Sequence, residues 1–464
     1  MRARWSILAV VFTALPVAGQ TVVNITTNTE GWESLIETNG PNYHYYFAPG
    51  TYQLADQLYI SRSNVHVYGN VSNRTERGVT SNGFPEVVFA AGESSRVIAF
   101  PNMPYPASNV IAGVTITGAA VSDGAVYAGT PTGYRPGHHT VSRCHVVSNA
   151  AAGLWRVSAE HSTIESCGSG YGGAYSVNMT NCAVINCYGT ANGGGVYNGA
   201  DQRLDNCLIA SNSGTRGGGV YGGAVYNSVV VSNYASDRGG AFYNVTSVSN
   251  YVAWNTSRMA AIAQYGNYTN CLFEHNSSGA VGSPAMNGMW VNCLFASNTT
   301  THANGGGAGA LGSYYGCVFV GNGAPNGKPQ VLYDVNNVFN CTFLSDSPYP
   351  ILSGENAYPF ANNIFAGSTN TSYSTTNLVA NFATNSAADL FIPDGLPYRI
   401  TEDSPCRNAG NDTYAITEFD FYGRDRTQGQ VDIGAVEWTP EIDAVGGGAD
   451  RKKMLLLLLT GGEL

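Results

Sequence analysis

A short phrase returns about every 22 residues along the middle of this chain. It consists of an Asn-Cys pair or a close relative, a triplet rich in β-forming residues and a closing Asn. Taking the cysteine or its replacement as the mark, the phrase stands at Cys144, Ser162, Cys182, Cys207, Ser228, Asn250, Cys271, Cys293, Cys317, Cys341 and Asn363. A fixed period of this length is typical of stacked units that cannot bury a hydrophobic face alone. The chain is therefore predicted to form a solenoid.

The residues around each mark indicate what one turn looks like. Two residues after the mark stands a Val, Ile or Phe, so both positions share one face of a strand and are expected to form ladders inside the coil. Five residues after the mark most turns carry Asn, as at Asn212, Asn233 and Asn255. Asn tolerates a left-handed backbone, and its amide can bond the amides above and below it. We expect this Asn column at a tight corner of each turn.

A second motif, small residues followed by an aromatic residue, repeats at the same pitch. Its aromatic residues are Trp155, Tyr175, Tyr197, Tyr221, Tyr243 and Tyr265. Because glycine permits the backbone angles of a sharp bend, each turn should contain at least two strands. The prediction is an all-β, single-stranded, right-handed parallel β-helix of roughly fifteen turns. If these rings face water, Trp155, Tyr175 and Tyr197 are candidate ligand-binding residues that stack on sugars; otherwise they pack beneath the glycine-rich corners.

The repeats resemble those of right-handed parallel β-helix proteins of the pectin-lyase-like type. They are most similar to bacterial surface proteins with GGGxY and NCxIxxN turns, such as the polymorphic outer-membrane repeat proteins. Near the C-terminus, Ser404-Pro405-Cys406, Gly423-Arg424 and Asp432 to Glu437 resemble the end of the choice-of-anchor Q domain. The resemblance implies the fold, but this architecture hosts lyases, hydrolases, adhesins and structural spikes alike.

The chain divides into five segments along its length. Residues 1–20 carry Arg2 and Arg4, an apolar run and small residues, which is the build of a secretory signal peptide. We therefore expect a protein that is secreted or displayed on the bacterial cell surface. Residues 21–118 are assigned to the N-terminal start and cap of the β-helix, 119–385 to its regular repeats, 386–440 to a closing segment over the solenoid end and 441–464 to a disordered tail. No segment of the mature chain is long enough to span a membrane, and a monomer is expected.

Charge and cysteine content limit the partners. The formal net charge of −10 argues against nucleic acid as a partner. Most of the ten cysteines fall in the repeat columns, where Ser and Asn replace them, so we expect packed thiols, with disulfides between neighbouring turns as the alternative. Neither a metal site nor a cofactor is expected, because no CxxC or clustered His/Cys spacing occurs. An extended polysaccharide or a cell-surface glycan is the expected partner.

One short stretch collects the candidate catalytic residues: Arg143, His145, Arg156, His161 and Glu165. Registering the turns on their marks places Arg143 beside His161 and His145 beside Thr163, on an exposed sheet face. His161 or His145 would take a proton next to a uronate carboxylate, while Arg143 or Arg156 neutralises the charge that builds up. The alternative interpretation of this cluster is a solvated, His-rich surface, since no recognised catalytic motif is present.

The preferred function of the protein is non-catalytic, adhesive or structural. The alternative function is that of a carbohydrate-active enzyme, a polysaccharide lyase rather than a glycoside hydrolase, acting on a glycan along the sheet.

Overall fold

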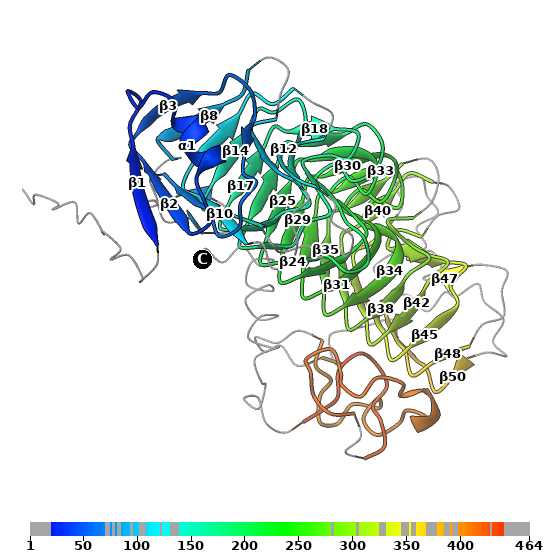
Figure 1. Cartoon of the computed structure of the whole chain (residues 1–464). Coiled ribbons are helices and arrows are strands. Elements are labelled where there is room, and N and C mark those ends of the chain that lie inside the picture. Colours follow the sequence, from blue (N-terminus) through cyan, green and yellow to red (C-terminus); the bar gives the residue numbers. More distant parts are fainter. Residues whose placement is uncertain are drawn as a thin grey trace, which may run out of the picture.

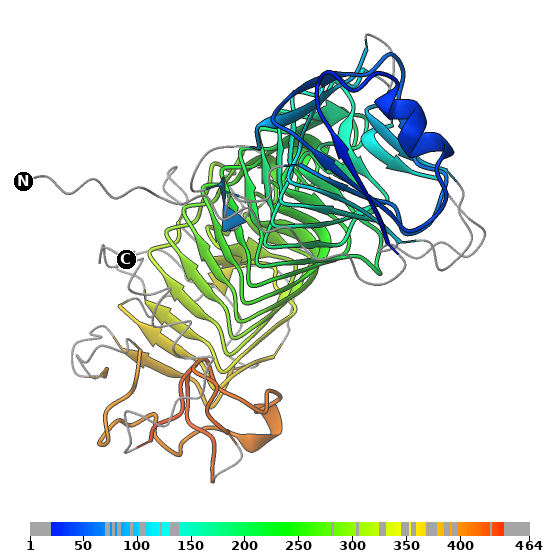
Figure 2. The same cartoon turned by 60° about the vertical axis from the view of Figure 1, so that its left-hand side comes forward.

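The described part of the chain coils into a parallel β-helix (Figures 1 and 2). The computed structural model describes residues 20–69, 75–76, 79–80, 85–92, 96–101, 108–120, 123–129, 139–279, 283–302, 306–323, 331–344, 352–353, 359–367, 378–384, 390–391, 398–426 and 429–439. The predicted signal peptide, apart from its last residue, and the predicted tail lie outside the described residues. The prediction of an all-β solenoid with about 22 residues per turn is confirmed, with about 13 turns instead of fifteen.

Each repeated phrase contributes one strand to a 15-stranded parallel sheet, which also has strands before the first phrase and after the last. Its strands are β3 (Gly50–Gln53), β8 (Val87–Ala90), β11 (Thr115–Thr117), β14 (His145–Val147), β17 (Thr163–Glu165), β21 (Ala183–Ile185), β25 (Leu208–Ala210), β29 (Val229–Val231), β32 (Tyr251–Ala253), β35 (Leu272–Glu274), β39 (Leu294–Ala296), β43 (Val318–Val320), β46 (Thr342–Leu344), β49 (Ile364–Ala366) and β51 (Phe382–Thr384). The ring centroids of Phe273, Phe295, Phe319 and Phe343 follow one another at 5.0, 5.0 and 4.6 Å inside the coil. The register read from the marks is therefore confirmed.

A second sheet of 27 strands consists of two columns, joined where β31 (Phe242–Val248) and β34 (Ala263–Thr269) run through both. The aromatic column further contains β4 (Leu58–Tyr59), β9 (Ile98–Phe100), β12 (Gly124–Ala128), β15 (Ala152–Trp155), β19 (Ala174–Tyr175), β23 (Val196–Tyr197), β27 (Val220–Tyr221), β37 (Ala285–Met286), β41 (Gly309–Ala310), β44 (Leu332–Tyr333) and β47 (Leu352–Ser353). The other column contains β1 (Thr21–Ile25), β2 (Tyr43–Phe47), β5 (His66–Tyr68), β10 (Asn109–Ala112), β13 (His139–Ser142), β16 (Ser158–Glu160), β20 (Met179–Thr180), β24 (Arg203–Asp205), β28 (Ala224–Tyr226), β38 (Met289–Val291), β42 (Ser313–Tyr315), β45 (Asn337–Phe339), β48 (Phe360–Ala361) and β50 (Leu378–Val379).

Two smaller sheets, an α-helix and the 3₁₀ helix η2 (Asp412–Tyr414) complete the described secondary structure. A 7-stranded parallel sheet lies between the 15-stranded sheet and the aromatic column along each turn: β18 (Gly168–Ser169), β22 (Tyr188–Gly189), β26 (Ser213–Arg216), β30 (Tyr234–Arg238), β33 (Thr256–Met259), β36 (Ser277–Ser278) and β40 (Thr299–Thr300). The strands β6 (Thr75–Glu76) and β7 (Val79–Thr80) pair with each other in antiparallel fashion. The helix α1 (Trp32–Thr38) closes the N-terminal end, where the Trp32 ring stacks on Phe89 at 5.8 Å.

The asparagine column is a continuous hydrogen-bonded ladder within the wall. The Nδ2 of Asn233 donates to the Oδ1 of Asn255 at 3.0 Å, and Asn255 donates in the same way to Asn276. The left-handed residue stands one position before this Asn, at Ser211, Ser232 and equivalent residues, so that part of the corner prediction is wrong by one residue. The reason is that the buried Asn needs an extended backbone to point inward, and the bend falls on its more exposed neighbour.

The cysteines are buried as thiols, and none of the ten forms a disulfide in the structure. Within the repeats each thiol lies against backbone carbonyls; the Cys271 Sγ donates to Thr269 O at 3.3 Å. Burial raises the pKa of Cys144 to about 12, so this thiol is a packing group and a poor nucleophile.

The closing segment lies along the side of the last turns, not across the end of the solenoid as expected (Figure 1). Its Phe421, Tyr422 and Val436 pack on Leu294 and Val318, which face outward from the 15-stranded sheet. The left-handed corner asparagines supply the polar contacts: Asn292 donates to Phe419 O, Asn340 to Asp432 O and Asn362 to Asn411 O. The apolar outward positions at β39 and β43 explain the placement, because they would otherwise expose a hydrophobic stripe.

A buried polar network holds the closing segment together. The Asp420 carboxylate accepts the backbone N–H groups of Tyr422, Arg424 and Glu437. Arg426, which is 3% exposed, forms an ion pair with Glu437 and donates to Ala435 O at 2.7 Å. The charged residues at the C-terminus therefore have a structural role within the segment.

Candidate functional site

The predicted catalytic cluster is divided between three places on the solenoid. His145 and Glu165 lie on neighbouring strands of the 15-stranded sheet, with His145 paired to Thr163 as expected. The Nε2 of His145 is 2.9 Å from the Oε2 of Glu165. However, His145 is only 6% exposed, so the expectation of an open sheet face is wrong at this residue. Burial lowers the pKa of His145, and the Glu165 carboxylate partly opposes this effect.

Arg143 and His161 are vertical neighbours at one left-handed corner, each with a φ of 50°. The backbone N–H of Arg143 donates to Glu160 O, and the Nε2 of His161 is 3.3 Å from the Nδ2 of Asn181. Their predicted proximity is thus confirmed. The Arg143 side chain is exposed and that of His161 is half-buried.

Arg156 lies on a different face from the other four candidates. Its guanidinium carbon is 5.9 Å from the Trp155 ring centroid and 5.7 Å from that of Tyr175. A bend and the strand β16 separate Arg156 from the 15-stranded sheet, so the structure does not place it beside His145 and Glu165 on that sheet.

The aromatic column forms a ladder of half-buried rings on the outer face of its strands. Centroids are 4.0 Å apart from Trp155 to Tyr175, 5.4 Å from there to Tyr197, and 4.8 and 5.1 Å along the next two steps to Tyr221 and Tyr243. Since the rings stack on one another, their faces are covered and their edges and hydroxyls point outward. The sequence analysis left two possibilities for these rings, exposure to water or packing beneath the glycine-rich corners. The structure combines features of both, because the rings pack against one another and the column borders solvent.

Three exposed tyrosines beside this ladder were not singled out from the sequence. Tyr171, Tyr188 and Tyr234 are 40%, 48% and 49% exposed. Tyr171 lies across the ladder, with its ring 4.9 Å from that of Tyr175 and 5.3 Å from that of Tyr197. The sequence does contain a signal for them. Tyr171 stands just before the GGxY motif of its turn, and Tyr188 and Tyr234 each follow the residue that closes an Asn-Cys phrase.

Tyr188 and Tyr234 occupy the same position on strands of the 7-stranded sheet. Both pair with Ser213, which lies on the turn between them, so they stand two turns apart. Tyr188 can lie against the backbone because Gly168 has no side chain; a Cβ there would collide with the ring. We call Tyr171, Tyr188 and Tyr234 together with the ladder from Trp155 to Tyr243 the tyrosine-rich face.

Arginines border the tyrosine-rich face at both ends. Arg156 lies beside Trp155, and Arg216 lies 5.8 Å from the Tyr243 ring. Arg216 and Arg238 are paired across neighbouring strands, and both contact the Asp237 carboxylate, at 3.4 and 3.5 Å. The face therefore combines aromatic surface with hydrogen-bond donors.

Neither a metal centre nor a membrane helix emerges from the part of the chain that the structure describes. In these residues no three His, Cys, Asp or Glu side chains are placed to hold a metal ion together. The helices in the same residues are too short or too polar to cross a bilayer.

Comparison with known proteins adds to the description of the fold. No protein-family model matches the chain, and no curated protein matches its sequence. Among solved structures, it is similar to pectate lyase Pel9A, at 13% identity and a TM-score of 0.29, over 90% of this chain and 97% of that one. It is also similar to a mannuronic acid specific family 6 polysaccharide lyase from human gut microbiota, at 9% identity and a TM-score of 0.42, over 81% and 92% of the two chains. An alginate lyase from Paenibacillus matches at 12% identity and a TM-score of 0.29, over 64% and 97%.

Proposed function

We propose that this protein binds an extended polysaccharide along the tyrosine-rich face. The observation that carries the proposal is the spacing of Tyr188 and Tyr234. Two turns of a parallel β-helix correspond to about 10 Å, which is comparable with the disaccharide repeat of an extended glycan. A glycan chain lying along the solenoid axis would therefore place every second sugar over an exposed ring.

The neighbouring side chains have the chemistry that such a ligand requires. Sugar rings have an apolar C–H face that packs on aromatic rings, and hydroxyls that need hydrogen-bond partners. The outward edges of Tyr175, Tyr197 and Tyr221 supply phenol hydroxyls, and Arg156 and Arg216 supply donors. Together with the predicted secretory signal, this arrangement favours an exported glycan-binding protein with an adhesive role.

Replacing Tyr188 and Tyr234 with serine tests the proposal. Each exposed ring should contribute about 1 kcal/mol to binding, so the double variant should bind about 30-fold more weakly. Affinity electrophoresis against a panel of neutral and acidic polysaccharides measures the change. Tyr226→Ser, on the other column, is the matched control and should bind normally. Unchanged binding by the double variant, or no binding of any polysaccharide by the parent, would contradict the proposal.

A second candidate function is cleavage of the bound glycan by elimination, with His145 as the base. A neutral imidazole oriented by a carboxylate is the arrangement of a general base, and the contact of His145 with Glu165 has this form. Binding ranks first because the burial of His145 keeps this pair from an extended chain. Incubating the same polysaccharides with the protein and following the ultraviolet absorbance of unsaturated products tests this candidate. Absorbance that rises with the parent and is lost with His145→Ala would establish it; a rise unaffected by that substitution would exclude His145.

A further inference from the structure

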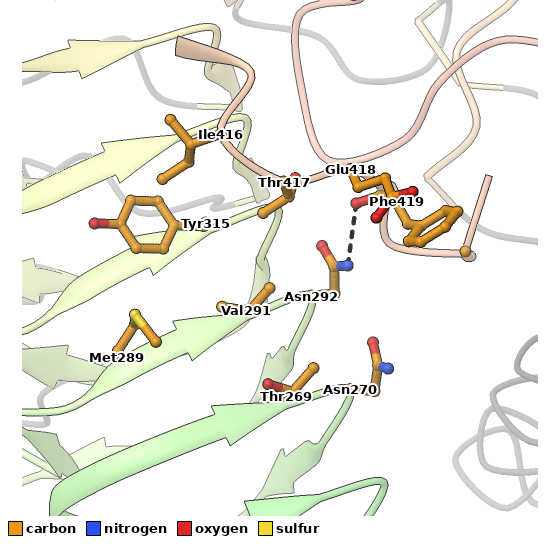
Figure 3. Close-up of a pocket in the computed structure, with 11 residues that line it drawn as sticks. Thr269, Asn270, Met289, Val291, Asn292, Tyr315, Ile416, Thr417, Glu418 and Phe419 are labelled. Carbon is orange, nitrogen blue, oxygen red and sulfur yellow. Dashed lines mark hydrogen bonds between the residues drawn. The ribbon is translucent and has the colours of Figure 1, made fainter. Parts of the chain in front are cut away.

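The closing segment and the solenoid enclose a cleft on the side of the molecule away from the tyrosine-rich face. The cleft has a volume of about 540 Å³. Figure 3 shows the residues of both walls, on the strands and on the facing closing segment. One wall of the cleft comes from the outer surface of β34, β38 and β42 and from the corners that follow β34 and β38. Its residues are Thr269, Asn270, Met289, Val291, Asn292 and Tyr315. The other wall comes from the closing segment, with Ile416, Thr417, Glu418, Phe419 and Gly423.

The cleft persists because the closing segment is anchored on either side of it. The Asn292 Nδ2 donates to Phe419 O at 3.2 Å, as Figure 3 shows, and before Ile416 the Asn362 Nδ2 donates to Asn411 O at 3.0 Å. Met289, Ile416 and Phe419 nevertheless remain 43%, 53% and 46% exposed. A recess between two structural units that exposes apolar side chains next to a few polar groups is the usual form of a small-molecule site.

The polar groups of the cleft indicate which ligands it takes. Asn270 contributes an amide, Thr269 and Thr417 contribute hydroxyls, and Glu418 contributes a carboxylate. Among the described residues that line the cleft, Glu418 is the one charged residue, and none is Arg or Lys. An anionic ligand would meet a like charge without a compensating cation, so acidic sugars are disfavoured.

We propose that this cleft is a binding site for the end of a neutral glycan, about one or two sugar units long. The apolar C–H face of a pyranose packs on Tyr315, Met289 and Ile416. Its hydroxyls donate to the Glu418 carboxylate and exchange hydrogen bonds with the Asn270 amide. The site does not depend on the tyrosine-rich face, because a short sugar fits the cleft alone. Since the ligand touches both walls, its binding also strengthens the docking of the closing segment.

The test uses the full chain with Tyr188 and Tyr234 replaced by serine, so that binding at the tyrosine-rich face does not contribute. Cellobiose, maltose and mannobiose represent neutral ligands, and digalacturonate represents acidic ones; calorimetric titration measures affinity. At least one neutral disaccharide should bind, at least about tenfold more tightly than digalacturonate. It should also raise the urea concentration at which a protease releases the closing segment.

Substitutions locate the site within the cleft. Met289→Lys replaces an apolar side chain of the cleft wall with a charged, hydrated one of similar size and should reduce neutral-sugar binding at least about tenfold. Asn267→Lys is the matched control, because Asn267 is exposed, pairs with Met289 on the preceding turn and is not part of the lining. Glu418→Gln should weaken the binding of neutral disaccharides and reduce the difference between their affinity and that of digalacturonate. No binding of the three neutral sugars, equal binding of digalacturonate, or full binding by Met289→Lys would overturn the proposal, whatever the result at the tyrosine-rich face.

Discussion

Replacing Asn255 with leucine is expected to destabilise the solenoid by about 4 kcal/mol. The Asn255 Oδ1 accepts both the backbone N–H and the Nδ2 of Asn233, at 2.9 and 3.0 Å. Its own Nδ2 donates to Val230 O and to the Asn276 Oδ1, both at 2.9 Å. Leucine has a similar volume but makes none of these bonds, so the buried N–H of Asn233 loses its acceptor and the Asn233 and Asn276 side chains lose their Asn255 partner. This cost greatly exceeds the value of a typical hydrogen bond in water.

Urea unfolding followed by circular dichroism measures the loss for Asn255→Leu. Hydrogen exchange should show increased opening first at Asn233, because its N–H loses its acceptor and because the turns of a solenoid are stabilised by their nearest neighbours. Asn267→Leu, at an exposed position on the next turn, should change the free energy of unfolding by less than about 0.5 kcal/mol. Equal effects of the two substitutions would show that the ladder contributes no more than an exposed asparagine.

Replacing Arg426 with methionine is expected to release the closing segment, at a cost of about 3 to 5 kcal/mol. Its side chain is 1% exposed and is the ion-pair partner of Glu437. Without this guanidinium, the buried Glu437 carboxylate lies near those of Asp420 and Asp432 and has lost its ion-pair partner. Limited proteolysis between Leu390 and Thr439 and urea unfolding measure the effect. Arg407→Met is the control: this guanidinium lies over the Trp438 ring, its side chain is 32% exposed, and its loss should cost less than about 1 kcal/mol.

The effect of Arg426→Met should depend on pH in a definite direction. Burial raises the pKa of Glu437 to about 7 from its ordinary 4.5, whereas Arg426 lowers it. An acid with a raised pKa binds its proton more tightly in the native state, so its contribution to stability falls as the pH rises from 4.5 through 7. Without Arg426 the ionised form is still more costly. The deficit of the variant should therefore be small at pH 5, where Glu437 is protonated in both proteins, and larger at pH 8; a deficit that is larger at pH 5 would contradict this account.

The fold could be predicted from the sequence because the solenoid is built from local, repeated units. Hydrogen bonds between adjacent turns hold equivalent residues of the repeat in register. The pairing of Phe295 with Phe319 on the next turn can therefore be found by counting residues from the marks. The corner was misplaced by one residue because residue type favours a left-handed backbone at Asn233, whereas the structure gives this conformation to Ser232. Which of the two residues adopts the left-handed conformation depends on which side chain is buried. Burial in turn depends on the residues stacked above and below on neighbouring turns.

The site was harder to predict because exposure on the outside of a coil is not periodic. His145 points away from the interior, as its register predicts, but it is covered, and the same is true of Leu294 and Val318 beneath the closing segment. That segment docks on Asn292 from 127 positions away in the sequence, a separation at which no periodicity applies. The face that remains open is instead marked by Tyr188 and Tyr234, which the register of the 7-stranded sheet places in line.

The side-on position of the closing segment has a mechanical consequence. Successive coils are joined by hydrogen bonds that point along the rod, so a pull on its two ends stretches these bonds head-on and can separate one coil from the next. The segment from Asn411 to Asp432 is fastened to the coils that carry Asn292, Asn340 and Asn362. It therefore distributes tension over several coils at this end, whereas in the earlier coils the load passes through the bonds between adjacent coils, among them those of the asparagine ladder.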